Sequence, residues 1–280
     1  MKQITYTSYS QLGTPRIFMR ELIADVKGTR ELGWRLFITN LRSQVRQSWL
    51  GYIWLIVPPL ITALIWIFLG RSKIINTNTA DHIYPIFVIS GIFIWQTFIE
   101  ALNMPIQQLQ AQKHVLTKVK APHEAFILAG LGGIIFNFLI RMICVLVLLA
   151  VFQIGFHATL LLVPFGILSV LVLGLAIGLF FTPIGMLYSD IPNGLNAIAS
   201  LMFFVTPIIY KIPTDTGIWR ILKYNPVTPL LVTTRNWIIN GIGVPENGFF
   251  IVLVLAGMIL AASWIFYRVA KPHLIARLSS

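Results

Sequence analysis

Charged residues are scarce in this sequence, and cysteine is nearly absent. Only 11% of the 280 residues are Asp, Glu, Lys or Arg, against 57% hydrophobic residues, whereas a soluble domain carries roughly a quarter charged residues. So little polar surface cannot cover a water-soluble globule. The mean hydropathy of +0.81 therefore indicates a protein whose solvent is lipid. The single cysteine, Cys144, excludes an internal disulfide and a multi-cysteine metal site.

Several catalytic and nucleotide-binding motifs are also missing. No Gly-Lys dipeptide occurs, which excludes the phosphate-binding loop of nucleotide motors. His123 and Glu124 begin a zinc-protease motif, but Leu128 stands where its second histidine belongs. The glycines of 130–133 lie in an apolar run, where close helix packing explains them better than a dinucleotide site does. We therefore predict no catalytic residue, no metal site and no cofactor in this chain.

The charges that are present are strongly unbalanced. Lys and Arg number 21 against 9 Asp and Glu, a formal net charge of +12. In a soluble domain this excess would indicate a nucleic-acid partner. Membrane proteins, however, concentrate Lys and Arg in their cytoplasmic segments, so we expect a membrane and no nucleic acid.

Six apolar stretches approach or exceed the roughly 20 residues that cross a bilayer. They predict spans at residues 50–70, 83–102, 125–152, 160–187, 191–210 and 249–267. Pro58 and Pro59 lie within the first span, where we expect a kink. Segments on the side of both termini hold 14 Lys and Arg, against 6 on the other side, which predicts that both termini are cytoplasmic. The predicted fold is a single all-α transmembrane domain, residues 1–280, with six transmembrane helices.

Three segments outside these spans also have recognisable patterns. In the N-terminal segment 1–49, apolar residues recur at helical spacing and arginines share another face: Trp34, Ile38, Leu41, Val45 and Trp49 against Arg35, Arg42 and Arg46. This pattern predicts an amphipathic helix in the membrane interface, with an ordinary charged flank as the alternative. Residues 105–121 predict a short cytoplasmic helix that docks on a soluble partner, or a surface loop. The insert 211–248 holds apolar patches too short to cross, which predicts re-entrant or interfacial helices that cap a pathway.

Arg141 lies deep within the third predicted span. An arginine at that depth costs at least about 2.5 to 3.5 kcal/mol on insertion scales, so its side chain should face protein or water. Two roles remain open: contact with an anionic group of a substrate, or a salt bridge or carbonyl contact between helices.

Four short motifs follow one another along the chain. Residues 46–59 fit R-Q-x-x-L-G-x-x-W-x-x-x-x-P, residues 116–124 fit L-x-K-x-x-x-P-x-E, residues 206–210 fit T-P-I-x-Y, and residues 225–235 fit an N-P motif followed by arginine. In this order the motifs resemble permeases of the ABC type-2 superfamily, above all the group that exports bacterial polysaccharides such as O-antigen, capsule and teichoic acid. One departure is Ser189 before Asp190, where the family often has an Arg-Asp pair.

The resemblance implies a transporter subunit of the bacterial cytoplasmic (inner) membrane. Two copies would form the channel, and a separate ATPase chain that binds ATP and Mg would drive it. The substrate implied is a polyprenyl-linked glycan. Residues expected to couple to the ATPase are Lys113, Leu116, Lys118, Pro122, Glu124, Arg42 and Arg46. Those expected at the outer gate are Pro207, Tyr210, Asn225, Pro226 and Arg235.

Aromatic side chains can stack on sugar rings inside an apolar wall. Our channel candidates are therefore Arg141, Trp54, Trp95, Phe203 and Phe204, although most aromatics of membrane proteins face lipid or the interface. Two other functions remain open. One is export of a small molecule or drug by the same superfamily. The other is a membrane enzyme acting on polyprenyl-linked sugars, for which only Glu100, Glu124 and Asp190 offer carboxylates.

Overall fold

A computed structural model describes residues 29–43, 51–72, 83–112, 123–211 and 224–279. Within these ranges the regular elements are all helical. They are an N-terminal helix (29–43), η2 (Gly51–Leu55), α2 (Val57–Arg71), α3 (Tyr84–Ala111), α5 (His123–Val151), η3 (Ala158–Leu162), α6 (Val163–Gly185), α7 (Asp190–Val205), α9 (Val227–Ile239) and α10 (Phe249–Ser279).

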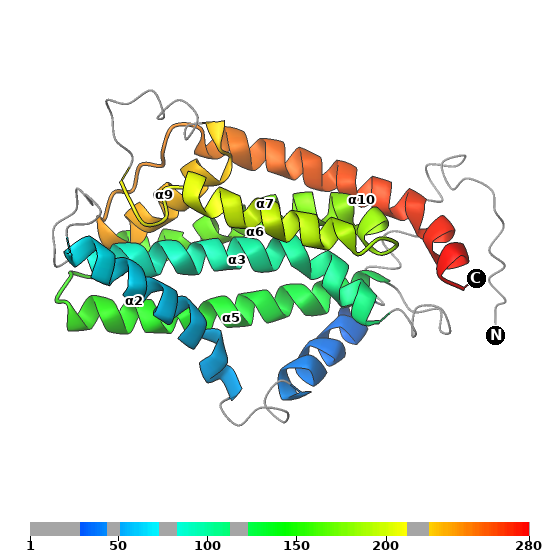
Figure 1. Ribbon diagram of the computed structural model, residues 1–280, viewed down its shortest axis with the longest axis horizontal. Helices are drawn as coiled ribbons and strands as arrows, with labels where there is room; N and C mark the ends of the chain where they lie inside the picture. Colours follow the sequence, from blue (N-terminus) through cyan, green and yellow to red (C-terminus); the bar gives the residue numbers. More distant parts are fainter. Residues whose placement is uncertain (1–28, 44–50, 73–82, 113–122, 212–223, 280) are drawn as a thin grey trace.

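The long helices lie side by side and run alternately back and forth along one direction (Figure 1). Helix α9 lies at one end of this bundle, which we call the α9 end. The N-terminal helix, the start of α5 and the end of α10 lie at the opposite end, which we call the Glu124 end (Figure 1). Helix α3 therefore connects the two ends directly, beginning at the first and finishing at the second.

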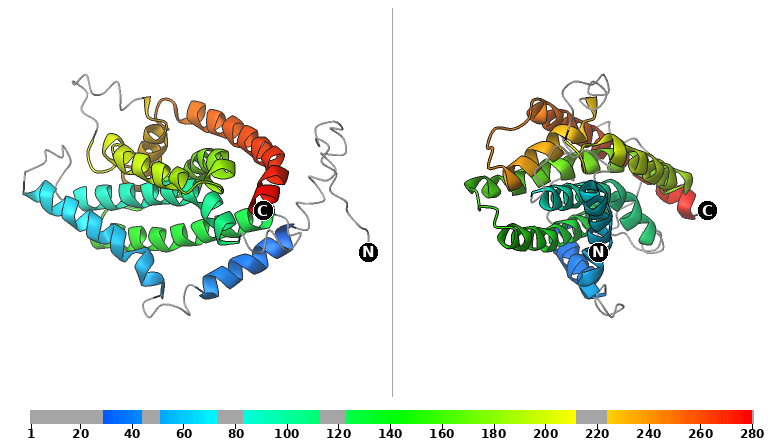
Figure 2. Two further views of the ribbon diagram at one scale, coloured as in Figure 1. Left: turned by 45° about the vertical axis from the view of Figure 1, so that its right-hand side comes forward. Right: turned by 60° about the vertical axis from the view of Figure 1, so that its left-hand side comes forward.

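Helix α3 is the centre of the packing. It contacts α2, α5, α6, α7 and α9, and Figure 2 shows it enclosed between α5 on one side and α6 and α7 on the other. Its most apolar 18-residue window is 83% buried, compared with 28% in α5 and 17% in α10. The outer helices thus present long apolar faces to their surroundings, which soluble monomers rarely do and which lipid would cover.

Small residues allow α3 and α6 to approach closely. A Cβ atom at Gly178 of α6 would collide with the carbonyl oxygen of Leu102, and one at Gly174 would lie 2.7 Å from the Cβ of Ala101. Close approach of this kind is how membrane helices associate, because lipid supplies no hydrophobic drive between them.

The glycines predicted to serve helix packing in the third span do so in two of three cases. A Cβ at Gly130 would meet Met104 of α3, and one at Gly132 would meet Phe37 of the N-terminal helix. Gly133 has open space around it, so packing does not explain that position.

Four of the described helices are long and apolar enough to cross a membrane: Tyr84–Ala111, Glu124–Val151, Ala158–Gly185 and Phe249–Lys271. They coincide with the second, third, fourth and sixth predicted spans and establish the all-helical membrane class. Helices α2 and α7 have 15 and 16 residues, about 22 to 24 Å at 1.5 Å per residue. They overlap the first and fifth predicted spans and each extends one residue beyond the predicted bounds, and six crossings stay a prediction.

The kink predicted at Pro58 and Pro59 is wrong. The chain forms the short 3₁₀ helix η2 and then starts α2 at Val57, so both prolines lie in the first turn of α2. Proline is favoured there, because the first backbone N–H groups of a helix have no partner within it. The prolines therefore begin the helix instead of bending it.

The segment 105–121 also differs from its prediction where the structure describes it. Residues 105–111 continue α3, with Pro105 inside the helix and Ile106 and Leu109 buried. No separate helix begins at 105, since the buried side chains keep this stretch in the bundle. Residues 113–122 lie outside the described part of the chain.

Candidate functional site

Helix α7 ends at a Thr-Pro step near the α9 end. Thr206 has φ −89° and ψ 137°, an extended conformation that a following proline favours by steric clash with the helical one. Pro207, Ile208 and Ile209 then continue without helical structure, yet all three are buried. The carbonyl groups of this segment therefore need partners from elsewhere.

Side chains of two other helices supply those partners. The guanidinium NH1 of Arg235 in α9 donates to the carbonyl oxygens of Pro207 at 2.8 Å and Ile208 at 3.1 Å. The hydroxyl of Tyr84 in α3 donates to the carbonyl oxygen of Ile209 at 3.2 Å. Three consecutive carbonyls are thus satisfied from outside their own segment, which is the condition for non-helical backbone inside a membrane protein.

Asn225 holds the start of α9 against the same segment. Its side-chain amide donates to the hydroxyl oxygen of Thr206 at 2.8 Å, and its side-chain oxygen accepts the N–H of Val227 at 3.0 Å. The second bond is a local turn that asparagine favours before a helix. We call the group Tyr84, 206–209, Asn225 and Arg235 the latch.

The charge of Arg235 is met by dipoles and an aromatic ring. Its side chain is 3% exposed, and no described carboxylate pairs with it. Its guanidinium carbon lies 3.6 Å from the ring centroid of Phe87, a cation–π arrangement.

Close approach of backbone completes the latch. A Cβ at Gly91 of α3 would lie 2.6 Å from the carbonyl oxygen of Ile208 and 3.4 Å from NH1 of Arg235. Helix α3 therefore contributes Tyr84, Phe87 and Gly91 on one face. These three were missed in the sequence, because an aromatic or a glycine in an apolar run equally suits a lipid-facing position.

The structure brings three of the five predicted outer-gate residues into the latch, namely Pro207, Asn225 and Arg235. Tyr210 is half-buried and its hydroxyl donates to the carbonyl oxygen of Phe204 at 3.0 Å. Pro226 is exposed and stands immediately before α9. Two of the four sequence motifs, 206–210 and 225–235, thus meet in space.

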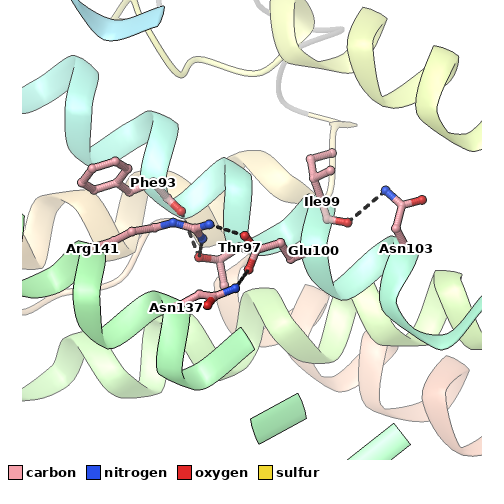
Figure 3. Close-up of polar contacts among 7 residues, drawn as sticks. All are labelled: Phe93, Thr97, Ile99, Glu100, Asn103, Asn137 and Arg141. Atoms are coloured by element: carbon pink, nitrogen blue, oxygen red, sulfur yellow. Dashed lines mark hydrogen bonds and ion pairs between the residues drawn. The ribbon is translucent and has the colours of Figure 1, made fainter. Parts of the chain in front are cut away.

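A second polar cluster lies midway along α3 and α5 (Figure 3). Arg141 forms an ion pair with Glu100, with side-chain exposures of 2% and 20%. Asn137 donates to the other Glu100 oxygen at 3.3 Å, and Arg141 approaches the Thr97 hydroxyl at 3.5 Å. Of the two roles left open for Arg141, the structure shows the salt bridge between helices.

A third cluster lies at the Glu124 end. The carboxylate of Glu124, 5% exposed, lies 3.6 Å from Nε of Arg268 and 3.6 Å from Nζ of Lys271. Glu124 thereby ties the start of α5 to α10. Arg42 is exposed on the N-terminal helix.

The remaining coupling candidates, Lys113, Leu116, Lys118, Pro122 and Arg46, lie outside the described residues. The apolar face predicted for the N-terminal helix is likewise only partly described. Residues 29–43 are helical with Phe37, Ile38 and Leu41 half-buried and Trp34 exposed, whereas Val45 and Trp49 fall outside. The position of this helix in the membrane interface stays a prediction.

The predicted channel aromatics differ in their surroundings. Trp95 is buried against Phe98 and Phe203, with ring centroids 5.3 and 6.1 Å apart. Phe204 is exposed and contacts Trp66 at 6.3 Å, and Trp54 is exposed in η2. Trp95 is therefore a core residue, while Phe204 and Trp54 are free to face lipid, a partner or a pathway. Among the described residues, no group of three His, Cys, Asp or Glu side chains is placed to hold a metal ion.

Long apolar helices, buried charges met by protein partners and a satisfied break in the backbone together define a polytopic helical membrane protein. No family model matches the chain. It is 26% identical over 214 residues to the O-antigen export system permease protein RfbA of Klebsiella pneumoniae, covering 73% of this chain and 79% of that protein. It is 23% identical over 218 residues to a protein of the same name from Myxococcus xanthus, covering 77% and 83%.

A third relative is the polysialic acid transport protein KpsM of Escherichia coli, 22% identical over 214 residues that cover 74% of this chain and 80% of that protein. The chain is thus a homologue of the permeases of bacterial polysaccharide export systems. The resemblance carried by the four sequence motifs is confirmed.

Proposed function

We propose that this chain is the membrane-spanning subunit of an ATP-driven exporter that moves a polyprenyl-linked polysaccharide outward across the bacterial cytoplasmic membrane. The observation that carries the proposal is the extent of the homology. The matches to O-antigen and polysialic acid export proteins cover about three quarters of this chain and about four fifths of theirs. The sequence has no phosphate-binding loop of its own, so in this proposal a separate nucleotide-binding chain supplies the energy.

In this proposal α2 and α7 complete six crossings and both termini are cytoplasmic. The alternating helix directions support the first statement, and the excess of Lys and Arg on the terminal side supports the second. The two short helices are extended by η2 and by the buried segment 206–209. A small shortfall in apolar length costs only fractions of a kcal/mol per Å. The Glu124 end is then the cytoplasmic end.

The latch then lies at the outer end, where α9 acts as a re-entrant gate helix. Helix α9 has 13 residues, about 20 Å, which is too short to cross. Eleven of those residues are buried, so protein covers it as a re-entrant segment requires. Release of the Arg235 bonds would free the end of α7 together with α9.

The ATPase, with its bound ATP and Mg, docks at the Glu124 end in this proposal. The basic segment 113–122 joins the end of α3 to the start of α5 there, and Arg42 is exposed on the N-terminal helix. Helix α3 has 28 residues, about 42 Å. It carries a displacement from this end to Tyr84 in the latch. A second copy of the chain completes the channel, and the N-terminal helix lies in the cytoplasmic interface.

The test is purification of the chain with its co-transcribed neighbours in mild detergent. We expect an ATPase subunit and a second copy of the chain in the complex, and loss of surface glycan when the gene is deleted. Lys118→Ala should reduce export several-fold at unchanged membrane level. Lys211→Ala, an exposed lysine at the α9 end, is the matched control and should not. A deletion strain that keeps all its surface glycan would contradict the proposal and favour export of a small molecule.

A further inference from the structure

Helix α3 carries a row of uncharged amide side chains on one face. Gln96, Asn103, Gln107 and Gln110 are spaced by seven, four and three residues, which places them on one side of a helix. Gln107 and Gln110 are exposed, Gln96 is half-buried and Asn103 is buried. Along the helix axis the row extends about 21 Å.

Helix α7 carries a matching row beside it. Asn193, Asn196 and Ser200 are spaced by three and four residues and all three are exposed, whereas Leu195 and Ala199 form the buried face of α7. The two rows meet where the amide of Asn103 donates to the side-chain oxygen of Asn196 at 2.8 Å. Figure 3 shows Asn103 on α3 just beyond Glu100 and pointing away from Arg141. We call these seven residues the amide stripe.

Contact with lipid is unfavourable for this polar surface. Within the described structure Gln110 donates to the carbonyl oxygen of Gly185 and Ser200 to that of Asn196, besides the bond between Asn103 and Asn196. Contact with lipid would leave the amides of Gln96, Gln107 and Asn193 without such a partner, which costs several kcal/mol, and polar groups of this kind on membrane helices face protein or water. The other exposed face of α7, with Ile198 and Leu201, has the composition that lipid selects. The two faces of one helix thus meet different surroundings.

None of the seven side chains carries a formal charge. The charged pair on α3 and α5, Glu100 with Arg141, is mutually neutralised. Each amide both donates and accepts hydrogen bonds, as does a sugar hydroxyl, and Phe203 of α7 lies three residues beyond Ser200. The stripe can therefore form hydrogen bonds with the hydroxyl groups of a polysaccharide at several positions. No ion pair with the stripe would hold the polysaccharide in one place.

We propose that the amide stripe is the wall of the conduit along which the glycan itself passes, and that it binds sugar hydroxyl groups. This inference rests on the proposed function and adds the surface and the chemistry of contact. The hydrogen bonds join uncharged groups and recur along the stripe. Each sugar unit can therefore move its hydrogen bonds from one stripe residue to the next while the polymer advances.

The experiment is cysteine labelling of the complete transporter in membrane vesicles, on a Cys144→Ser background. Single variants Asn193→Cys, Ser200→Cys and Gln107→Cys report on the stripe, and Ile198→Cys and Leu201→Cys are matched controls on the apolar face of α7. A membrane-impermeant maleimide reacts with the thiolate, which needs water. We expect stripe positions to label at least about tenfold faster than the controls.

The occupant is identified by repeating the labelling with vesicles from cells that make the glycan and from cells that lack its first glycosyltransferase. Slower labelling of the stripe by several-fold in glycan-producing cells supports the proposal. Equal rates in both strains, or equal rates at stripe and control positions, overturn it. Slow labelling together with disulfide cross-links between two copies at Ser200→Cys also overturns it, because the stripe then faces a second copy. Surface glycan measured in the same cells reports separately on the proposed function.

Discussion

The two most deeply buried arginines of the described residues are held in opposite ways. Arg141 is 2% exposed and meets a carboxylate, Glu100, across the contact between α5 and α3. Arg235 is 3% exposed and meets two backbone carbonyls and the ring of Phe87. The first cation is neutralised by an opposite charge, whereas the second is stabilised only by dipoles and a π-system.

Because of this difference, the two arginines have different structural roles. Both partners of an ion pair between helices can be replaced together by apolar residues at little cost, because neither charge is then left without its partner. The partners of Arg235 are the backbone carbonyls of Pro207 and Ile208. No substitution removes a backbone carbonyl, so replacing Arg235 always leaves these groups without their donor. Arg235 therefore serves the irregular segment 206–209, and Arg141 serves the contact of two regular helices.

The largest expected effect breaks the Arg141 pair. Arg141→Leu leaves Glu100 without its counter-charge and should lower the free energy of unfolding by about 3 to 5 kcal/mol. The double variant Glu100→Leu with Arg141→Leu should recover most of this loss. Unfolding of the purified protein in detergent, by heat or by SDS titration, measures both. A double variant no more stable than the single one would show that Arg141 has another essential partner.

Arg235→Leu tests the other arginine. It leaves the carbonyls of Pro207 and Ile208 buried without donors, so we expect a loss of about 2 to 4 kcal/mol. Arg235→Lys should restore less than half, because an ammonium group has no planar face to lie against the ring of Phe87. The same unfolding assay applies. Full stability of the lysine variant would mean that charge alone suffices and that the geometry of the latch is incidental.

Gly91→Ala tests the latch without touching an arginine. The new Cβ would lie 2.6 Å from the carbonyl oxygen of Ile208, so the segment must shift, and such overpacking costs about 1 to 3 kcal/mol. Gly257→Ala in α10 is the matched control, because no atom lies within 4 Å of its new Cβ. That control should keep its stability or gain up to about 1 kcal/mol from the higher helix propensity of alanine, and equal effects at both positions would argue against a close approach at Gly91.

The smallest effect concerns a third, exposed arginine. Arg35 pairs with Glu31 on the N-terminal helix at 2.7 Å, and both side chains are 75% exposed. Arg35→Ala should cost no more than about 0.5 kcal/mol, since water screens a pair of this kind. A loss comparable with that of Arg141→Leu would indicate that this helix is covered in the working complex.

The helix positions were the most predictable part of the structure. Residues 125–152 and 160–187 are apolar runs, and lipid requires every spanning segment to be apolar and to satisfy its own backbone. The same reasoning predicted that Arg141 faces protein or water and not lipid. It did not identify Glu100 as the ion-pair partner of Arg141, because the second span was expected to end at 102. In the structure α3 continues to Ala111, and Glu100 lies inside the helix opposite α5.

The latch was only partly predictable. Motifs supplied Pro207, Asn225 and Arg235 as candidates for one region, but the contact between Arg235 and Pro207 joins residues 28 positions apart. Tyr84 reaches Ile209 across 125 positions. Pairings of this separation depend on how α3, α7 and α9 cross, and no local pattern encodes a crossing.

The amino-acid order by itself determined which stretches avoid water and where Lys and Arg are concentrated along the chain, because these follow from the solvent preference of individual residues. Only the tertiary structure decided which carbonyl receives Arg235, which carboxylate neutralises Arg141 and that two rows of amides lie side by side. Those outcomes depend on the packing of helices in three dimensions, in which residues far apart in the chain become each other's surroundings.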